Sequence, residues 1–520
     1  MTVQRTVALN SITFTIASAS ALQAQGSATT GPTADPTPFL TLTGTGPAPR
    51  LLELVGPRLR IVGSVTAQSA GWEGTVPLLA SRWGSRLLAP PSGNYRIKVD
   101  GHDALLDTDD ACHSRAATLE EQLVPGLFRI AATLNDGVAV ITISPPLTDE
   151  EVGVSNQSRL EAQYRSTDVA PRGAVFFESF YGQNASCNPL ALDRALASLR
   201  PEVTRYWAVA DASVDVPDGA VGVIEGSAAW WQARAESRLI VINDWLRNRF
   251  RKRKHQTVLQ TWHGTMLKKL ALSRSRLGLR PALATLRERS RWDILLAQND
   301  YAARIFRRAY AYFGTIWEEG YPRDDALLTG DPSEIRARLG IPPDVRVLLY
   351  APTWRDDRPD HVDHLDVSRF AELLGPGYVT LIRGHSRTLQ PGVDVRAGGV
   401  LDVTSYPDVS DLFLTADALI TDYSSVMFDF SVTGKPIFFF TPDLDRYRQV
   451  LRGFYFDLLP VAPGPLVQKA SELVELVHNV DAVQQEFAEK YASWQKRFNP
   501  HDDGRAAESI ITRLTREGKI

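Results

Sequence analysis

Strand-like and helix-like segments alternate along the chain from residue 173 onward, in two successive stretches. Short apolar runs flanked by turn residues are typical of buried strands, and strands that alternate with helices form parallel sheets. The first stretch has expected strands at 174–177, 205–210, 221–224, 239–242, 257–261 and 294–298, and expected helices at 189–199, 227–235 and 301–310. The second has expected strands at 345–351, 378–382, 400–403, 418–421 and 436–440, and expected helices at 367–374, 409–415, 424–432, 465–479 and 483–497. The pattern predicts an α/β fold with two Rossmann-like lobes facing across a cleft, a GT-B-like architecture.

The first 150 residues have a different pattern, with short apolar runs separated by Gly, Pro, Asn and Asp, which is typical of a β-rich domain. At the N-terminus Ile12, Phe14 and Ile16 alternate with polar residues, which favours a first strand over a cleaved signal peptide. The expected organisation is a β-rich accessory domain at 1–150, a linker at 151–172, an N-terminal α/β lobe at 173–335 and a C-terminal α/β lobe at 336–520.

Composition and motifs exclude several classes of protein. An apolar fraction of 44% and a charged fraction of 22% are ordinary for a globular chain. Two cysteines, Cys112 and Cys187, can form at most one disulfide, so a reducing compartment is expected. No apolar run reaches the roughly 18 residues of a membrane-spanning helix. The sequence also has no P-loop, strand-anchored GxGxxG, CxxC or HExxH motif, so we expect no cofactor and no metal.

Basic residues are concentrated in one segment although the formal net charge is only −3. Residues 247–308 contain 17 Lys or Arg side chains against three acidic ones, a net charge of +14. Such a patch attracts phosphates or an anionic membrane surface. The segment also carries the leucines Leu267, Leu270, Leu272, Leu277 and Leu279. We therefore expect contact with an anionic membrane, the alternative being a solvated basic face near a phosphate site.

The strongest candidate for chemistry is the run Trp262-His263-Gly264-Thr265, at the carboxyl end of the expected strand 257–261. Active-site loops of open α/β sheets lie at such strand ends. His263 can accept a proton from an alcohol near neutral pH, and Gly264 permits close approach of the backbone to a ligand. The alternative is a histidine satisfied within a turn.

Three runs of the second lobe could bind phosphate or a nucleotide. Arg383 and His385 follow the strand 378–382 and could donate hydrogen bonds to phosphoryl oxygens. Ser424 and Ser425 start a helix, where free N–H groups favour an anion, although they could merely cap it. In the run 350–355, Trp354 could stack on a base and Arg355 could meet a phosphate, or they could be a packed aromatic beside a surface charge.

In combination these motifs resemble the CDP-glycerol glycerophosphotransferase family, the teichoic-acid primases and polymerases. The matching runs, spread over residues 174–500, are 175–180, 182, 188–189, 261–265, 320–325, 350–355, 383–385, 421–425, 434–436, 443–447 and 452–455. Two positions depart from the family pattern, Met266 and Gly384, where the family usually has proline or a close variant. The first 150 residues lie outside the resemblance.

The resemblance implies a two-lobed transferase that works at the cytoplasmic face of the membrane, bound peripherally. Such an enzyme moves glycerol phosphate, or a related polyol phosphate, from a CDP-activated donor to a hydroxyl of a lipid-linked acceptor and releases CMP. By similarity, His263 is the general base and His385 stabilises charge on the donor pyrophosphate. The further candidates for substrate binding are Trp262, Gly264, Thr265, Thr353, Trp354, Arg355, Arg383, Thr421, Asp422, Ser424, Ser425 and Asp429, with Glu178, Ser179 and Asn188 on the acceptor side.

Two other functions are compatible with the sequence. One is a GT-B sugar transferase that uses a nucleotide sugar, and the other is a non-catalytic glycan-binding protein in which the β-rich domain does the binding. We expect a CDP-polyol donor, a lipid-linked acceptor and an anionic membrane surface as partners, and no nucleic acid. The sequence does not indicate which polyol, which acceptor, which oligomeric state or what role residues 1–150 have.

Overall fold

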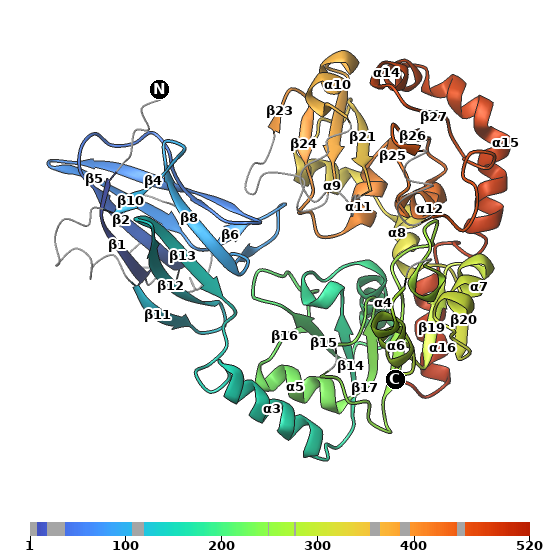
Figure 1. Cartoon of the computed structure of the whole chain (residues 1–520), viewed down its shortest axis with the longest axis horizontal. Helices are drawn as coiled ribbons and strands as arrows, with labels where there is room; N and C mark the ends of the chain where they lie inside the picture. Colours follow the sequence, from blue (N-terminus) through green and yellow to red (C-terminus); the bar gives the residue numbers. More distant parts are fainter. Residues whose placement is uncertain are drawn as a thin grey trace.

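The computed structural model describes residues 8–17, 37–106, 119–247, 249–274, 277–353, 365–384, 396–444 and 453–520. Two α/β lobes, each built on a seven-stranded sheet, lie one above the other in Figure 1, and a β-rich N-terminal unit lies beside them. The expected fold class is confirmed. Among the described residues, no helix combines the length and the apolar character needed to cross a bilayer.

The first lobe has a fully parallel sheet with the strand order β16-β15-β14-β17-β18-β19-β20. Its strands are β14 (Arg172–Glu178), β15 (Thr204–Val209), β16 (Val221–Ile224), β17 (Ser237–Ile242), β18 (Thr257–Gln260), β19 (Ile294–Ala297) and β20 (Thr315–Glu318). Its helices include α4 (Cys187–Leu199), α5 (Ala228–Glu236), α6 (Leu279–Arg289) and α7 (Asp300–Ala309). The sequence did not predict β20 or α6. In β20 only Trp317 is buried, and α6 buries only Thr285 and Glu288, so neither has a strong apolar pattern.

The second lobe repeats this design with the strand order β23-β24-β22-β21-β25-β26-β27, in which only the short β23 is antiparallel to its neighbour. Its strands are β21 (Arg346–Ala351), β22 (Tyr378–Ile382), β23 (Arg396–Ala397), β24 (Val400–Asp402), β25 (Ala418–Thr421), β26 (Ile437–Phe440) and β27 (Leu466–Val467). Its helices include α9 (Pro332–Leu339), α10 (Val367–Leu374), α11 (Val409–Thr415), α12 (Val426–Phe430), α14 (Ala470–His478) and α15 (Val480–Phe498). In both lobes the first strand is central, so the order reverses there. Ligands of such sheets bind at the carboxyl ends of the strands near this reversal.

The C-terminal helix α16 (Ala506–Arg516) returns from the second lobe to pack on the first. Its side chains Ile510 and Leu514 are buried in one cluster with Leu192 and Leu196 of α4. The carboxylate of Asp325, which begins α8 (Asp325–Thr329), accepts hydrogen bonds from the first two N–H groups of α16 at 3.0 and 2.8 Å. The chain therefore crosses between the lobes twice, which fixes them to each other near the candidate site.

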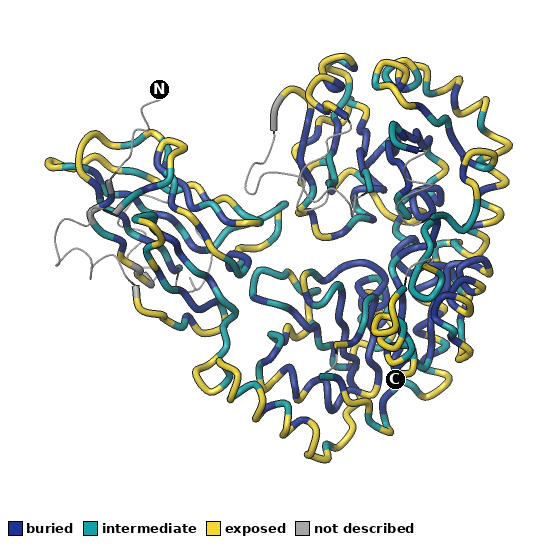
Figure 2. Tube along the Cα trace, viewed as in Figure 1, coloured by how far each residue is buried: buried dark blue, intermediate teal, exposed yellow. Residues whose placement is uncertain are grey.

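The N-terminal unit is an eleven-stranded, mostly antiparallel sheet with its own apolar core. Its strands, together with the short β6–β7 hairpin, are β1 (Ala8–Ala17), β2 (Thr37–Gly44), β3 (Leu52–Val55), β4 (Arg60–Gln68), β5 (Gly71–Pro77), β6 (Ala80–Ser81), β7 (Leu87–Leu88), β8 (Gly93–Val99), β9 (His102–Asp103), β10 (Leu105–Leu106), β11 (Leu119–Val124), β12 (Phe128–Asn135) and β13 (Val138–Ser144). In β2 buried and half-buried residues alternate, as a strand with one face on a core requires. The stretch predicted as a linker contains the helix α3 (Val154–Ser166), most of whose surface is exposed in Figure 2. Only Leu160 and Tyr164 of α3 are buried, so this segment has no apolar periodicity from which a helix could be predicted.

The packing of α16 predicts a local stability effect. Replacing the fully buried Ile510 by alanine should lower the free energy of unfolding by about 2–5 kcal/mol, because a cavity forms between α16 and α4. Thr512→Ala, on the exposed face of the same helix, should change it by less than about 0.5 kcal/mol. Denaturant-induced unfolding measures both, and equal effects of the two substitutions would contradict this packing.

Candidate active site

The loop after β18 has an unusual backbone that neighbouring side chains hold in place. Trp262 adopts a left-handed conformation, with φ at 55°, which is unfavourable for a bulky residue. The side-chain amide of Asn188 donates hydrogen bonds to the carbonyl oxygens of Thr261 and Trp262, at 3.2 and 3.1 Å. The Trp262 N–H donates to the Gln260 side chain at 2.9 Å. Strained backbone persists only where the surroundings determine it, and such positions cluster at functional sites.

The imidazole of His263 is oriented by one short hydrogen bond. Its Nδ1 lies 2.6 Å from the carbonyl oxygen of Asn243, the residue that follows β17. Because a carbonyl can only accept, Nδ1 carries the proton, and the neutral ring keeps its lone pair on Nε2. The ring stacks on Trp262, with ring centroids 5.0 Å apart, and lies 5.6 Å from the Phe180 ring. Burial lowers the pKa of His263, while the hydrogen bond to Asn243 opposes this effect, so the ring is held in its basic form.

The loop of His263 touches the second lobe directly. Gly264 has a φ of 149°, and a Cβ placed there would lie 3.2 Å from the hydroxyl oxygen of Ser425. Glycine suits this close approach, because the backbone conformation at this position is one that other residues rarely adopt. Ser424 and Ser425 are half-buried at the start of α12, and the Ser425 side chain makes no capping hydrogen bond to that helix. The alternative that Ser425 merely caps this helix is therefore not observed.

A buried guanidinium joins the two lobes next to this contact. Arg323 lies in the short 3-10 helix η3 (Pro322–Asp324), and its Nη2 donates to the Asp429 carboxylate of α12 at 2.6 Å. Its Nη1 donates to the Cys187 sulfur at 3.2 Å, and its backbone N–H donates to the Asn188 side chain at 3.1 Å. All of these side chains are at least 90% buried.

Burial, and then the charge of Asp429, raise the pKa of the neighbouring Asp324 well above its ordinary value.

Several predicted residues are fully buried and make contacts within the protein near the site. The Thr265 hydroxyl donates to the Gln298 side chain at 2.6 Å, and the Thr421 hydroxyl donates to the Ala351 carbonyl at 2.7 Å. Thr265 and Thr421 are fully buried, as is Asn188. Their observed contacts are those of positioning residues.

On the acceptor side, Glu178 ends β14 and is 8% exposed, and burial raises its pKa. The next residue, Ser179, donates its hydroxyl hydrogen to Asn184 at 2.9 Å. The Phe180 N–H donates to the side chain of Asn243 at 2.9 Å, so the loop after β14 and the His263 ring share one anchor.

In the second lobe, Asp422 accepts a hydrogen bond from the Thr353 N–H at 2.9 Å. The Thr353 hydroxyl accepts from the ammonium group of Lys268, which belongs to the first lobe, at 3.2 Å. The Arg383 guanidinium donates to the Tyr406 carbonyl at 2.8 Å, and burial lowers its pKa to about 10. The other three predicted residues, Trp354, Arg355 and His385, lie outside the described residues.

The sequence did not assign a role to two residues that organise this site. Asn243 directly follows the apolar run of β17, so its position at a strand end could have indicated it. Arg323 is connected to Asn188 and to Asp429 across 135 and 106 residues, and only the fold brings these together. Within the described ranges, no group of three or more His, Cys, Asp or Glu side chains is placed to hold a metal ion.

Comparison with known proteins identifies the family. The model of the family described as CDP-Glycerol:Poly(glycerophosphate) glycerophosphotransferase matches residues 162–516. The chain belongs to this CDP-glycerol glycerophosphotransferase family. The resemblance inferred from the motifs is therefore confirmed. The match begins within α3, so the whole β-rich unit lies outside it.

Individual members of the glycerophosphotransferase family agree with this assignment. The teichoic acid poly(glycerol phosphate) polymerase of Bacillus subtilis (strain 168) is 36% identical over 65% of this chain and 48% of its own length. The teichoic acid glycerol-phosphate transferase of Staphylococcus aureus (strain NCTC 8325 / PS 47) is 35% identical over 65% of this chain and 92% of its own. The solved structure of the wall teichoic acid polymerase TagF is 35% identical, with a TM-score of 0.65, over 69% of this chain and 93% of that one. The chain spans about half the length of the poly(glycerol phosphate) polymerases that head these matches.

The buried Arg323–Asp429 pair predicts a large stability effect. Replacing Arg323 by methionine should lower the free energy of unfolding by about 3–5 kcal/mol, because it leaves the Asp429 charge buried without its partner. The control Arg304→Met breaks an exposed pair with Asp300 and should cost less than about 1 kcal/mol.

Adding Asp429→Leu to Arg323→Met should recover most of the lost stability, since two apolar side chains leave no uncompensated charge. Urea unfolding of the two single variants and the double variant measures this. Additive losses in the double variant would show that the two residues do not act as a pair.

Proposed function

We propose that this chain transfers glycerol phosphate, or a related polyol phosphate, from a CDP-activated donor to a hydroxyl of a lipid-linked acceptor and releases CMP. The observation that carries the proposal is the arrangement of His263, whose Nδ1 is committed to Asn243 while its loop meets Ser425 of the other lobe. The names of the relatives support it, as they are glycerol-phosphate polymerases and transferases. Solved structures of TagF include a histidine-to-asparagine variant soaked with CDPG.

In the proposed reaction, the acceptor oxygen attacks the phosphorus that bears the glycerol. The new P–O bond forms as the bond from that phosphorus to the bridging oxygen of the pyrophosphate breaks, and CMP leaves with the bridging oxygen. His263 Nε2 takes the proton of the acceptor hydroxyl. Phosphoryl transfer mainly requires positioning and stabilisation of charge on the phosphate oxygens.

The second lobe supplies the proposed donor site. The hydroxyls of Ser424 and Ser425 bind the pyrophosphate, and His385, with Arg383, stabilises its charge as the bond breaks. Trp354 and Arg355, which follow Thr353 in the sequence, bind the nucleotide. The group that accepts the proton and the groups that donate hydrogen bonds to the phosphates then come from different lobes. The reaction therefore occurs only where the lobes meet.

Replacing His263 by asparagine should lower the rate of CMP release by about 10²–10⁴-fold, because the proposed general base is lost. The assay uses CDP-glycerol with a lipid-linked acceptor. His255→Asn is the matched control, since His255 is half-buried in the same lobe and its ring is hydrogen-bonded to the Ala235 carbonyl. Full activity of His263→Asn would contradict the assignment of the base.

A panel of donors separates this function from the two alternatives. CDP-glycerol or CDP-ribitol should give CMP release, and UDP-sugars should give no nucleotide release. Turnover with a UDP-sugar would indicate the sugar transferase. Binding of glycans without turnover of any donor would indicate the non-catalytic protein.

The lowered pKa of His263 predicts the pH dependence of the reaction. The base is active when neutral, so kcat/KM should rise with pH through the pKa of the free enzyme. Because burial lowers this pKa, the midpoint of the acidic limb should lie below the ordinary histidine value of about 6.5. This limb should be absent from the residual activity of His263→Asn. A midpoint above 6.5, or the same limb in the variant, would contradict the prediction.

We further propose that α6 rests on an anionic membrane surface. Leu279 and Leu283, one turn apart on α6, are 85% and 66% exposed, and Arg280 and Arg287 are exposed on the same helix. An exposed apolar pair flanked by arginines is typical of helices that lie in the membrane interface. Of the other leucines in the basic segment, Leu267 is buried in the core, so fewer leucines are exposed for membrane contact than the sequence suggested.

Replacing both Leu279 and Leu283 by serine should weaken binding to phosphatidylglycerol vesicles by about tenfold or more, since each leucine loses its apolar burial in the bilayer. Leu373→Ser, at a 44% exposed leucine of the second lobe, serves as the control. Co-sedimentation with vesicles measures the binding. Equal binding of the double variant and the wild type would contradict this contact.

A further inference from the structure

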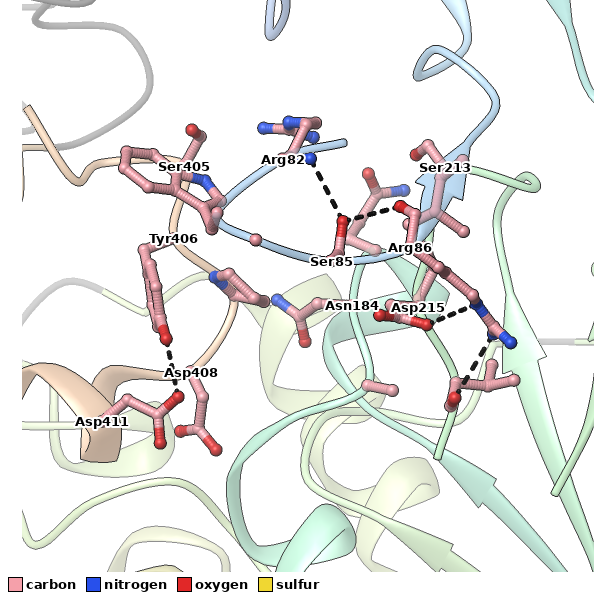
Figure 3. Close-up of a pocket in the computed structure, with 18 of the residues that line it drawn as sticks. Arg82, Ser85, Arg86, Asn184, Ser213, Asp215, Ser405, Tyr406, Asp408 and Asp411 are labelled. Carbon is pink, nitrogen blue, oxygen red and sulfur yellow. Dashed lines mark hydrogen bonds and ion pairs between the residues drawn. The ribbon is translucent and has the colours of Figure 1, made fainter. Parts of the chain in front are cut away.

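A cavity of about 1310 Å³ lies where the N-terminal unit meets both α/β lobes. The turn of the β6–β7 hairpin, residues 82–86, forms one wall and reaches both lobes (Figure 3). Trp83 packs edge-on against Tyr406 of the second lobe, with ring centroids 5.6 Å apart. Arg86 pairs with Asp215 of the first lobe at 2.8 Å. The cavity is therefore built partly from the N-terminal unit, which lies outside the residues that the family model matches.

The cavity is connected to the candidate active site through two elements of the first lobe. Asn184 lines the cavity and accepts the hydrogen bond of Ser179, in the same short loop whose Phe180 ring lies 5.6 Å from the His263 ring. Helix α4 holds the Trp262 backbone through Asn188 near its start, and its Arg194 lines the cavity. Six residues of helix separate these two positions, which is about 9 Å along the axis.

The lining of the cavity has the chemistry of a site for phosphate and hydroxyl groups. Its charged residues are eight arginines and six aspartates, with no lysine or glutamate. Arginine binds phosphate oxygens through a planar, two-pronged fork. Arg194 is exposed and makes no ion pair within the described part of the chain. The pair of Arg86 with Asp215 is 55% and 43% exposed, so a ligand phosphate can replace the aspartate at little cost.

Hydroxyl and amide groups line the same cavity as these arginines. Ser85, Ser213 and Ser405 line the cavity together with Asn184, and Figure 3 shows them on different walls. The volume exceeds the roughly 300–1,000 Å³ typical of small-molecule sites. A polar cavity of this size is suited to several repeats of a chain in which phosphates alternate with hydroxylated carbons.

We propose that this cavity binds the polyol-phosphate chain of the acceptor, so that the N-terminal unit gives the enzyme a preference for acceptors that already carry several repeats. This inference rests on the proposed function and extends it from the reacting hydroxyl to the chain behind it. The end of the chain lies at His263, and the preceding phosphates lie between Arg194 on α4 and Arg86 on the hairpin.

The test uses the full chain and the double variant Arg194→Gln/Arg86→Gln. The control is Arg369→Gln, at an exposed arginine of α10 that pairs with Glu372 and does not line the cavity. The first measurement is direct binding of a fluorescent poly(glycerol phosphate) oligomer of about eight repeats, without donor. The Kd should rise about tenfold or more in the double variant and stay unchanged in the control, because charge-assisted hydrogen bonds are lost.

The second measurement is CMP release with a one-repeat and an eight-repeat acceptor. In the double variant, KM for the long acceptor should rise while kcat and the kinetics with the short acceptor stay at wild-type values. Unchanged oligomer binding overturns the inference and leaves the proposed function intact. Equally tight binding of a neutral glycan also overturns the inference, because the arginines would then not be recognising phosphate groups. Absence of CMP release with every acceptor, together with arginine-dependent binding of the oligomer, contradicts the proposed function and not the cavity.

Discussion

The buried guanidinium of Arg323 is the interaction on which the arrangement of the two lobes depends. It binds Asp429 of the second lobe and, through its backbone, Asn188 of the first. Asn188 in turn holds the carbonyl groups on either side of the left-handed Trp262. A charge with this degree of burial is stable only with its partner in place, so separating the lobes at this contact would leave an unpaired buried charge. The loop that carries His263 is thereby fixed against Ser425.

This arrangement is consistent with the proposal that the first lobe supplies the base and the second lobe supplies hydrogen-bond donors to the phosphates. Both sheets present the carboxyl ends of their central strands to the region where the lobes meet. The carbonyl of Asn243 selects the tautomer of His263, and partial burial keeps the ring neutral. A neutral imidazole whose second nitrogen is committed to the backbone is suited to accept a proton rather than to carry a charge.

Much of the fold could be predicted from the sequence because the local signals agree with the tertiary structure. The helices at 367–374 and 409–415 have the predicted bounds, since Asp366 and Asp408 precede them and cap them. His263 and Ser425 could be selected as candidate site residues because strand ends and helix starts are visible in the sequence. The role of Arg323 could not be predicted, because its contacts with Asn188 and Asp429 join residues more than a hundred positions apart. The helix α3 was missed because it has only two buried positions, and the cavity could not be foreseen because three separate units line it.

The central claim is that His263 is a neutral base whose free nitrogen is Nε2, and a nitrogen-15 NMR titration of the histidine rings tests it most directly. The resonance that disappears in a His263→Asn variant belongs to this ring. We expect that resonance to show a protonated Nδ1 and an unprotonated Nε2 at pH 7, with a pKa below the ordinary value of about 6.5. A ring that carries its proton on Nε2 at pH 7, or that is still positively charged there, would contradict the account.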